Sequence, residues 1–209
     1  MTVTVLLVRH GAHALLGRRL VGRMAGVGLA PEGRVQAARL ADRLAAERPA
    51  ALQTSPLRRA RETAAPIALR LGLPAQVVPA LDEIDFGDWT GLDFTSLEGD
   101  PLWRQWNTER AAVRPPGGET VADVQRRVMR HIEETRRTHP GAAVAMVSHG
   151  DVIKAAVACC LGLDADAFAR FEVSPAGVTR LSLDDDGGAR LLALNEPCPA
   201  PPGPVEAWP

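Results

Sequence analysis

Two short apolar runs in this chain each end in a histidine that is followed by a glycine. Residues 3–8 lead into an Arg-His-Gly sequence that contains His10, and residues 142–147 lead into a Ser-His-Gly sequence that contains His149. Runs of this length and composition favour strands that are buried on both faces. In one parallel sheet with helical crossovers, both histidines would come to the same edge, which is where open α/β sheets bind ligands.

The chemistry that these residue types favour is the capture of an anion beside a nucleophile. A neutral imidazole is nucleophilic, a guanidinium fits phosphate or carboxylate, and a glycine lets the backbone turn sharply near a ligand. We therefore hypothesise that His10 is a nucleophile and that Arg9 clamps an anion, with Gly11 making the turn. A structural turn histidine is the alternative that the tripeptide alone leaves open.

A cluster of arginines follows another expected strand, at residues 51–54. Arg58, Arg59 and Arg61 lie at the start of the helix that should come next. Arginine in a first turn opposes the helix dipole, and an anion bound nearby would remove the conflict. The residues alone do not decide between Arg58 and Arg59, and a solvated arginine stripe is an equally good interpretation.

An acidic loop at residues 81–91 carries four carboxylates together with Phe86 and Trp89. A carboxyl group against aromatic surface has a raised pKa and can serve as a general acid. The composition also fits a turn-rich acidic loop without a chemical role.

The segments between these groups alternate between strand and helix patterns, which predicts an α/β fold. The last two expected strands are joined by an Asp-Gly-rich hairpin turn. Further strands are expected at 75–78, 168–173, 177–183 and 189–194. Helices are expected to begin at Pro31 and at residue 151. Two more helices are expected to follow a cap, one at Thr54 or Ser55 and one at Thr120, where Asp123 would complete a capping box.

Length and composition bound the class of protein. The chain has 209 residues, is 46% hydrophobic and has a net charge of -1, which suits one domain and gives no general attraction to nucleic acid or membrane. We expect no signal peptide, no membrane span and no disulfide framework, hence a cytoplasmic protein. The expected organisation is one domain over 1–196, with a cap segment inserted at about 92–117, and a mobile proline-rich tail over 197–209.

The motifs, taken in order, resemble those of the histidine phosphatase superfamily, which includes cofactor-dependent phosphoglycerate mutases and small bacterial phosphatases. The match extends over roughly residues 3–162. The motifs are Leu7-Val8-Arg9-His10-Gly11, the stretch from Ser55 to Thr63, Glu83 with Phe86-Gly87-Asp88-Trp89-Thr90-Gly91, Gly118-Glu119-Thr120, and Val147-Ser148-His149-Gly150.

The resemblance implies a three-layer α/β/α sandwich with a mostly parallel central sheet, of the phosphoglycerate mutase-like type. It implies that His10 attacks phosphorus and becomes phosphohistidine, and that Glu83 gives a proton to the leaving oxygen. It implies no metal and no cofactor. The groups that it implies around the phosphoryl oxygens are Arg9, Arg59, His149 and the backbone amide of Gly150.

The chain departs from the family pattern just after the first histidine. Where the family usually has Glu or Gln, then Thr or Ser, and later Asn, this chain has Ala12, His13 and Leu16. We expect thinner polar support for the phosphate, with His13 replacing one lost donor. His10 and His13 would form a metal pair only with a carboxylate or thiol partner, and none is close in sequence.

Three functions compete. The leading prediction is a metal-independent phosphomonoesterase that acts on a small-molecule phosphate ester, not on nucleic acid or membrane. The second is a phosphoglycerate mutase-type phosphotransferase; mutases usually have Glu-Arg-His-Tyr-Gly where residues 83–87 here read Glu-Ile-Asp-Phe-Gly, and they carry a longer insertion with paired arginines. The third, which the altered residues after Gly11 suggest, is a non-catalytic phospho-ligand binding module.

Overall fold

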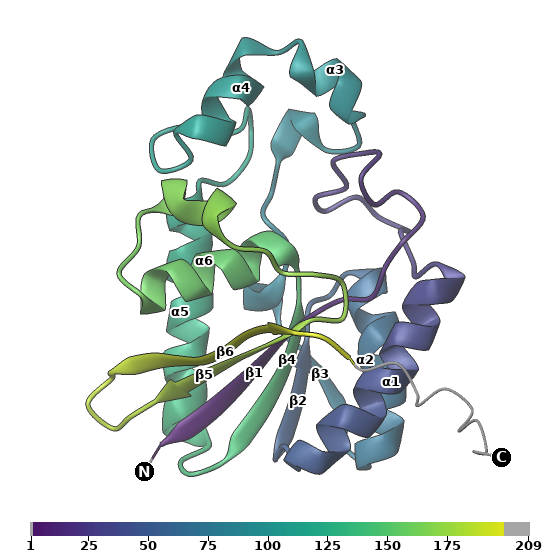
Figure 1. Ribbon diagram of the computed structural model, residues 1–209, viewed down its shortest axis with the longest axis vertical. Coiled ribbons are helices and arrows are strands. Elements are labelled where there is room, and N and C mark those ends of the chain that lie inside the picture. Colours follow the sequence, from purple (N-terminus) through teal and green to yellow (C-terminus); the bar gives the residue numbers. More distant parts are fainter. Residues whose placement is uncertain (1, 199–209) are drawn as a thin grey trace, which may run out of the picture.

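The computed structural model describes residues 2–198 and places a six-stranded sheet between two layers of helices (Figure 1). The expected three-layer α/β/α sandwich is confirmed. The strands are β1 (Val3–Arg9), β2 (Ala51–Thr54), β3 (Ala75–Val77), β4 (Ala143–Ser148), β5 (Val178–Leu183) and β6 (Ala189–Glu196). The α-helices are α1 (Pro31–Glu47), α2 (Arg58–Leu71), α3 (Phe94–Glu98), α4 (Pro101–Thr108), α5 (Val121–Thr138) and α6 (Gly150–Cys160).

The sheet has the strand order β3-β2-β4-β1-β5-β6. The first four of these strands run parallel to one another, and β5 runs antiparallel to β1 and to β6. In the central pair, Val8 lies opposite Val147 and Arg9 lies opposite Ser148. This register puts the residue that follows each strand at the same height on the carboxyl edge of the sheet.

The position of β1 between the two helix layers explains why most of its residues are apolar. Val3, Val5 and Leu7 pack in the cluster that includes the buried faces of α5 and α6, whereas Leu6 and Val8 pack in the cluster that includes α1 and α2. All five side chains are fully buried. Each contributes roughly 1.5–3 kcal/mol of burial free energy, so the central strand is fixed firmly between the helix layers.

The starts of α5 and α2 differ in how well they match the expected caps. The capping box of α5 is confirmed, because Thr120 and Asp123 each accept from the other's backbone N–H. The expected cap of α2 at Thr54 or Ser55 is wrong, since the N-cap residue is Leu57 and no side chain caps it. The chain makes a further turn there, in which the Leu57 N–H donates to the Ser55 hydroxyl.

The strand expected at 168–173 is also wrong. Residues Ala165–Arg170 form a 3-10 helix, which Asp164 caps by accepting from the backbone N–H of Asp166. The side chain of Phe168, which belongs to this short helix, is buried, although the segment does not pair with the sheet. A capped 3-10 helix can bury the apolar residues of this segment as a strand would, so the apolar pattern alone did not distinguish the two.

The cap segment carries α3 and α4, which lie above the carboxyl edge of the sheet in Figure 1. Trp103 and Trp106 are 9% and 1% exposed, and their rings stack with centroids 5.2 Å apart. The Trp89 ring meets the Trp103 ring edge to face at 5.3 Å. These aromatic side chains therefore pack the cap segment together. The proposed division into a domain over 1–196 with this insertion stays a prediction, and the tail expected at 197–209 lies outside the described residues from 199 onward.

Among residues 2–198, none of the helices has both the length and the apolar character that crossing a bilayer requires. The three cysteines, Cys159, Cys160 and Cys198, are free thiols.

The loop after His10 is held against the first turn of α1 by close contact between backbones. A Cβ atom on Gly11 would lie 2.6 Å from the carbonyl oxygen of Gly33, and a Cβ atom on Gly33 would lie 2.1 Å from the carbonyl oxygen of Ala12. Only glycine allows this approach, so these two positions set where the loop lies.

We predict that Gly33→Ala lowers the free energy of unfolding by about 1–3 kcal/mol, because the added methyl group forces the loop away from α1. Alanine is the better helix former by about 1 kcal/mol, which makes a loss of stability diagnostic. Urea denaturation measures it. The matched control is Gly99→Ala, where φ is -74° and the nearest atom to a Cβ is at 3.4 Å. Equal effects of the two substitutions would contradict the proposed contact.

Candidate active site

His10 and His149 meet at the carboxyl edge of the sheet. Their ring centroids are 5.1 Å apart, and the side chains are 2% and 0% exposed. The parallel register of β1 and β4 produces this meeting directly, since each histidine follows the last residue of its strand.

The ring of His10 is held in one tautomer. Its Nδ1 lies 2.7 Å from the carbonyl oxygen of Gly11, to which it donates, and its Nε2 accepts from Nε of Arg59 at 3.2 Å. A nitrogen that accepts a hydrogen bond carries a lone pair, so Nε2 is the nucleophilic atom of this imidazole.

The guanidinium of Arg59 lies between the two imidazoles. Besides the bond from Nε to His10, its Nη2 donates to Nδ1 of His149 at 3.1 Å and to the carbonyl oxygen of Gly22 at 2.8 Å. The residue is 2% exposed, and its Nη1 has no hydrogen-bond partner. One buried cation therefore orients both rings and keeps one donor unused.

His149 is oriented from its other side by a chain of hydroxyl and carboxylate groups. Because Nδ1 accepts from Arg59, Nε2 carries the proton and donates to the hydroxyl of Ser55 at 2.8 Å. That hydroxyl donates to Oδ1 of Asp82 at 3.2 Å. The expected helix cap, Ser55, is thus part of the support of a site imidazole.

Burial lowers the pKa of His10 and of His149 well below the ordinary value, and the nearby Arg59 guanidinium lowers both pKa values further. A buried imidazolium beside a guanidinium would suffer desolvation and like-charge repulsion together. Both rings are therefore neutral near pH 7, as nucleophilic attack by His10 requires.

The guanidinium of Arg9 lines the same cavity as His10. Its Nη1 donates to the carbonyl oxygen of Val173, and its Nε is buried without a partner. The guanidinium of Arg9 packs against Gly150, where a Cβ atom would lie 3.4 Å from the guanidinium carbon. Gly150 also begins α6, and the first amides of a helix have no partner inside it.

Glu83 brings a carboxyl group to the same place. It is 8% exposed, and its Oε2 lies 3.9 Å from Nδ1 of His149. Burial, with the neighbouring carboxylate of Asp151, raises the pKa of Glu83 to about 8. The carboxyl group is therefore largely protonated at neutral pH and can give up a proton, as a general acid must.

Two arginines from other elements fix the backbone of the acidic loop. Nε of Arg23 donates to the Glu83 carbonyl oxygen at 2.8 Å, and Nη2 of Arg127 donates to the same oxygen at 3.2 Å. Both also bind the carboxylate of Glu119. Arg23 thus holds this loop in place.

A cavity of about 160 Å³ opens onto these groups. Of the residues considered for the anion site, Arg9, His10, Arg59 and Glu83 line it, as does His13, whose ring centroid lies 5.5 Å from that of His10. Further lining residues are Leu16, Gly17, Arg19, Leu20, Val21, Gly22, Phe86, Phe94 and Asp151. The cavity is therefore lined by both charged and apolar side chains.

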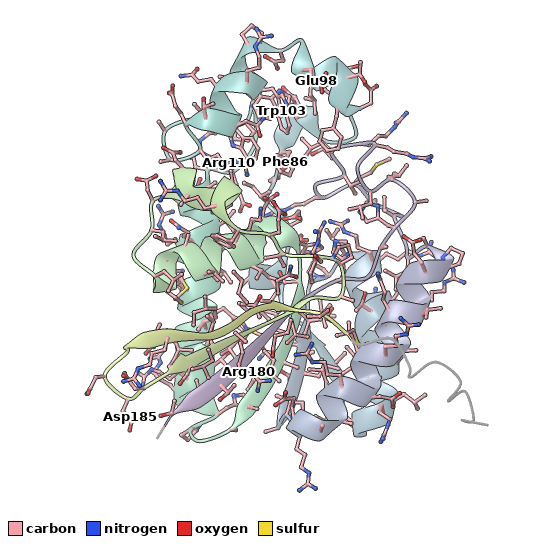
Figure 2. All side chains as sticks on the ribbon, in the orientation of Figure 1. Phe86, Glu98, Trp103, Arg110, Arg180 and Asp185 are labelled. Atoms are coloured by element: carbon pink, nitrogen blue, oxygen red, sulfur yellow. The ribbon has the colours of Figure 1, made fainter. Side chains whose placement is uncertain are left out.

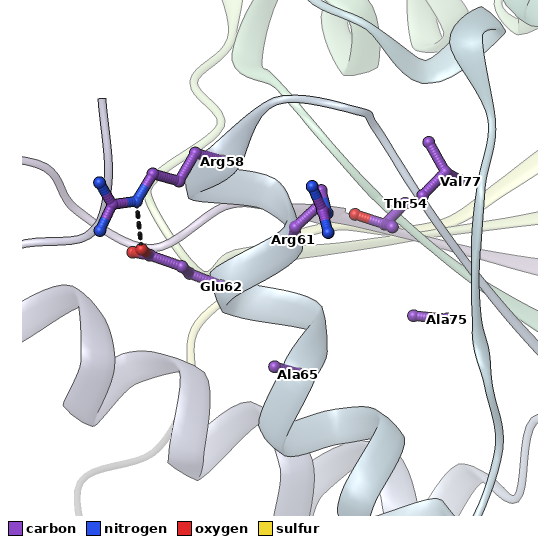
Figure 3. A pocket seen from close by; sticks show the side chains of 7 residues that line it. All are labelled: Thr54, Arg58, Arg61, Glu62, Ala65, Ala75 and Val77. Carbon is purple, nitrogen blue, oxygen red and sulfur yellow. Dashed lines mark hydrogen bonds and ion pairs between the residues drawn. The ribbon is translucent and has the colours of Figure 1, made fainter. Parts of the chain in front are cut away.

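The two neighbouring arginines at the start of α2 point to different places. Arg59 enters the site, whereas Arg58 pairs with Glu62 at 2.6 Å on the helix surface. Figure 3 shows this pair beside a separate groove of about 470 Å³ between α2 and the strands β2 and β3. The groove is larger than the cavity at His10 but is lined by neither site histidine.

Arg110 of the cap segment is engaged in packing. Figure 2 shows Arg110 and Phe86 below the cap helices and Trp103 within them. The Arg110 guanidinium lies 4.0 Å from the centre of the Trp106 ring, and its Nη1 lies 3.6 Å from Oδ1 of Asp151. Arg110 thus joins the cap segment to the start of α6.

Sequence reasoning missed Asp151 and the supporting roles of Ser55 and Arg127. Asp151 follows Gly150 in the first turn of a helix, and this position was the available signal. Ser55 begins the family motif that ends at Thr63, but only the structure shows that its hydroxyl faces His149. In the part of the chain that the structure describes, no three His, Cys, Asp or Glu side chains group as metal ligands would.

The fold and site together define a class of α/β protein in which a neutral imidazole, two guanidinium groups and a protonated carboxyl group line one cavity. Neither His149 nor Gly150 is among the lining residues, although the His149 ring lies 5.1 Å from that of His10. Residues 5–197 match the family described as the histidine phosphatase superfamily (branch 1). The chain belongs to this family.

Individual relatives carry the names of phosphatases. The chain is 32% identical over 201 residues to phosphoserine phosphatase 1 of Hydrogenobacter thermophilus, covering 94% of this chain and 93% of that protein. It is 34% identical over 195 residues to a bifunctional protein of Mycobacterium tuberculosis, covering 92% of this chain but 53% of that protein. The chain thus spans about half the length of that relative.

The structure resembles that of a mycobacterial glucosyl-3-phosphoglycerate phosphatase, with a TM-score of 0.85 at 28% identity over 94% of this chain and all of that one. The same mycobacterial protein in complex with inorganic phosphate gives a TM-score of 0.83 at 29% identity, covering 93% of this chain and 98% of that one.

Proposed function

We propose that the protein is a metal-independent phosphomonoesterase that hydrolyses a small phosphorylated metabolite through a phosphohistidine on His10. The observation that carries this proposal is a set of unpaired buried nitrogens. Within residues 2–198, four buried polar side-chain atoms lack a hydrogen-bond partner, and three of them belong to residues that line the His10 cavity: Arg9 Nε, His13 Nδ1 and Arg59 Nη1.

Leaving a buried polar group unsatisfied costs about 1–3 kcal/mol, so three such atoms around one cavity call for a ligand rich in acceptors. Two of them are guanidinium N–H groups, which can only donate. A phosphoryl group offers several acceptor oxygens and negative charge, and it would satisfy these donors together. Two guanidinium groups also neutralise the charge of the transferring phosphoryl group, which is the part that a metal plays elsewhere.

The first chemical step follows from the geometry. Nε2 of His10 forms a bond to phosphorus as the bond from phosphorus to the ester oxygen breaks. Arg59, whose Nε donates to that Nε2 at 3.2 Å in the resting site, turns its donors to the phosphoryl oxygens. Glu83 transfers its proton to the leaving oxygen, which departs as an alcohol.

The second step restores the protein. The carboxylate of Glu83 accepts a proton from a water molecule as the water oxygen bonds to phosphorus. The bond between phosphorus and Nε2 of His10 breaks, inorganic phosphate leaves, and the imidazole is neutral again. Covalent capture divides one difficult displacement into two easier ones.

The relatives support hydrolysis of a small phosphate ester, because the names that they carry are those of phosphoserine and glucosyl-3-phosphoglycerate phosphatases. In the cap segment, Trp103 and Trp106 stack on each other, and Arg110 lies over the Trp106 ring and pairs with Asp151 of α6. No observation in the site favours the mutase-type phosphotransferase or the non-catalytic binding module.

We predict that the protein releases inorganic phosphate from at least one member of a panel of aryl and sugar phosphates, in the presence of a chelator and without added bisphosphoglycerate. His10→Ala should lower the rate by at least about 10³-fold, because it removes the nucleophile. The control is His139→Ala, at the far end of α5. Phosphate release that is equal in the His10→Ala protein would contradict the proposal, as would binding of esters without any turnover.

We predict that Glu83→Gln lowers kcat/KM, which includes only the steps up to departure of the leaving group, by about 10²–10⁴-fold for alkyl phosphates and much less for aryl phosphates, whose phenolate leaves without a proton. For alkyl phosphates the parent rate should fall as the pH rises through about 8, where Glu83 loses its proton. The variant should lack this decline. The exposed Glu98, mutated to Gln, is the matched control. Equal losses of kcat/KM for both ester classes would exclude Glu83 as the proton donor.

A further inference from the structure

His13 is a third imidazole at the anion cavity. It lies three residues after His10, is 6% exposed, and its ring centroid is 5.5 Å from that of His10. Its Nδ1 is buried and has no hydrogen-bond partner, and the residue lines the cavity. A buried imidazole that faces a cavity with an unused ring nitrogen indicates a contact that a ligand completes.

The charges around His13 come from several elements. Arg9 and His10 belong to β1 and its exit, and Arg59 belongs to α2. Burial lowers the pKa of His13 to about 4, and the charges of Arg59 and Arg9 contribute to that lowering. The other charged or titratable groups that line the cavity are Arg19, Glu83 and Asp151.

The three imidazoles differ in their capacity for another proton. Both ring nitrogens of His10 are engaged, one with Gly11 and one with Arg59, and both nitrogens of His149 are engaged, one with Arg59 and one with Ser55. A proton added to either ring would point an N–H group at the N–H groups of Arg59. His13 is free of this conflict, since its Nδ1 is unengaged.

We propose that His13 is a further phosphate-binding residue, which takes up one proton from solvent when a dianionic phosphoryl group enters the cavity and then donates to a phosphoryl oxygen. This inference rests on the proposed function and specifies how the same site binds its anion. Burial and the two arginines together keep His13 neutral, and a dianion opposes both effects because it offsets the arginine charges and attracts a cation.

Proton uptake on binding has a consequence for affinity. By linkage, an anion that binds the protonated form of His13 binds more tightly as the pH falls, by up to about tenfold per pH unit at full coupling. The added positive charge offsets the carboxylate of Asp151, which lines the same cavity. When inorganic phosphate departs, the imidazole returns its proton to solvent.

The test uses inorganic sulfate as the probe, because sulfate stays a dianion throughout the pH range in which histidine titrates. Long-range ¹H–¹⁵N correlation spectra of the parent protein report the protonation of each of its five histidines. His13→Gln assigns the His13 signals, and His139 serves as an internal control. We expect bound sulfate to raise the pKa of His13 from about 4 by at least three units, with the pKa of His139 unchanged.

Calorimetry in buffers of different ionisation enthalpy gives the number of protons taken up with sulfate. At pH 6 the parent should take up close to one proton, and His13→Gln should take up almost none. The affinity for sulfate should strengthen on acidification in the parent and change much less in the variant.

The outcomes separate the two proposals. If sulfate binds while His13 stays neutral, or if uptake is unchanged in His13→Gln, the inference fails and the proposed phosphatase activity is untouched. If the parent does not bind sulfate at all, both the inference and the anion site fail. Retained phosphate release in the panel assay would then show that the activity itself survives.

Discussion

A single buried guanidinium, that of Arg59, determines the arrangement of this site. It donates to Nε2 of His10, to Nδ1 of His149 and to the carbonyl oxygen of Gly22, while it is 2% exposed. These bonds fix both imidazoles with their lone pairs toward the cation and oppose protonation of either ring. The parallel register of β1 and β4 and the start of α2 bring the three side chains together.

The same interaction leaves the site incompletely satisfied. A buried cation is costly unless it is paired, and the bonds of Arg59 go to neutral acceptors. Nη1 of Arg59 and Nε of Arg9 are buried donors without an acceptor. Glu83, whose raised pKa keeps it largely protonated, offsets little of this positive charge. Unsatisfied buried donors cost free energy, and a phosphoryl dianion would relieve that cost on binding.

The central strands and the meeting of His10 with His149 were predictable, because two uninterrupted apolar runs ending in histidine have few placements in a parallel sheet. The choice of Arg59 over Arg58 came from the family resemblance, since adjacent residues on a helix point in different directions that composition does not reveal. The strand expected at 168–173 failed because a capped 3-10 helix buries the same apolar residues. Which ring nitrogens are engaged depends on tertiary contacts alone.

The central claim is that Nε2 of His10 carries the phosphoryl group during turnover. The most direct measurement is to stop the reaction with an aryl phosphate during the first turnover, in alkali that preserves bonds between phosphorus and nitrogen, and to locate the phosphoryl group by peptide mapping. We expect one phosphoryl group per protein chain, bonded to Nε2 of His10. A phosphoryl group on another residue or on Nδ1, or turnover without any covalent phosphoprotein, would contradict it.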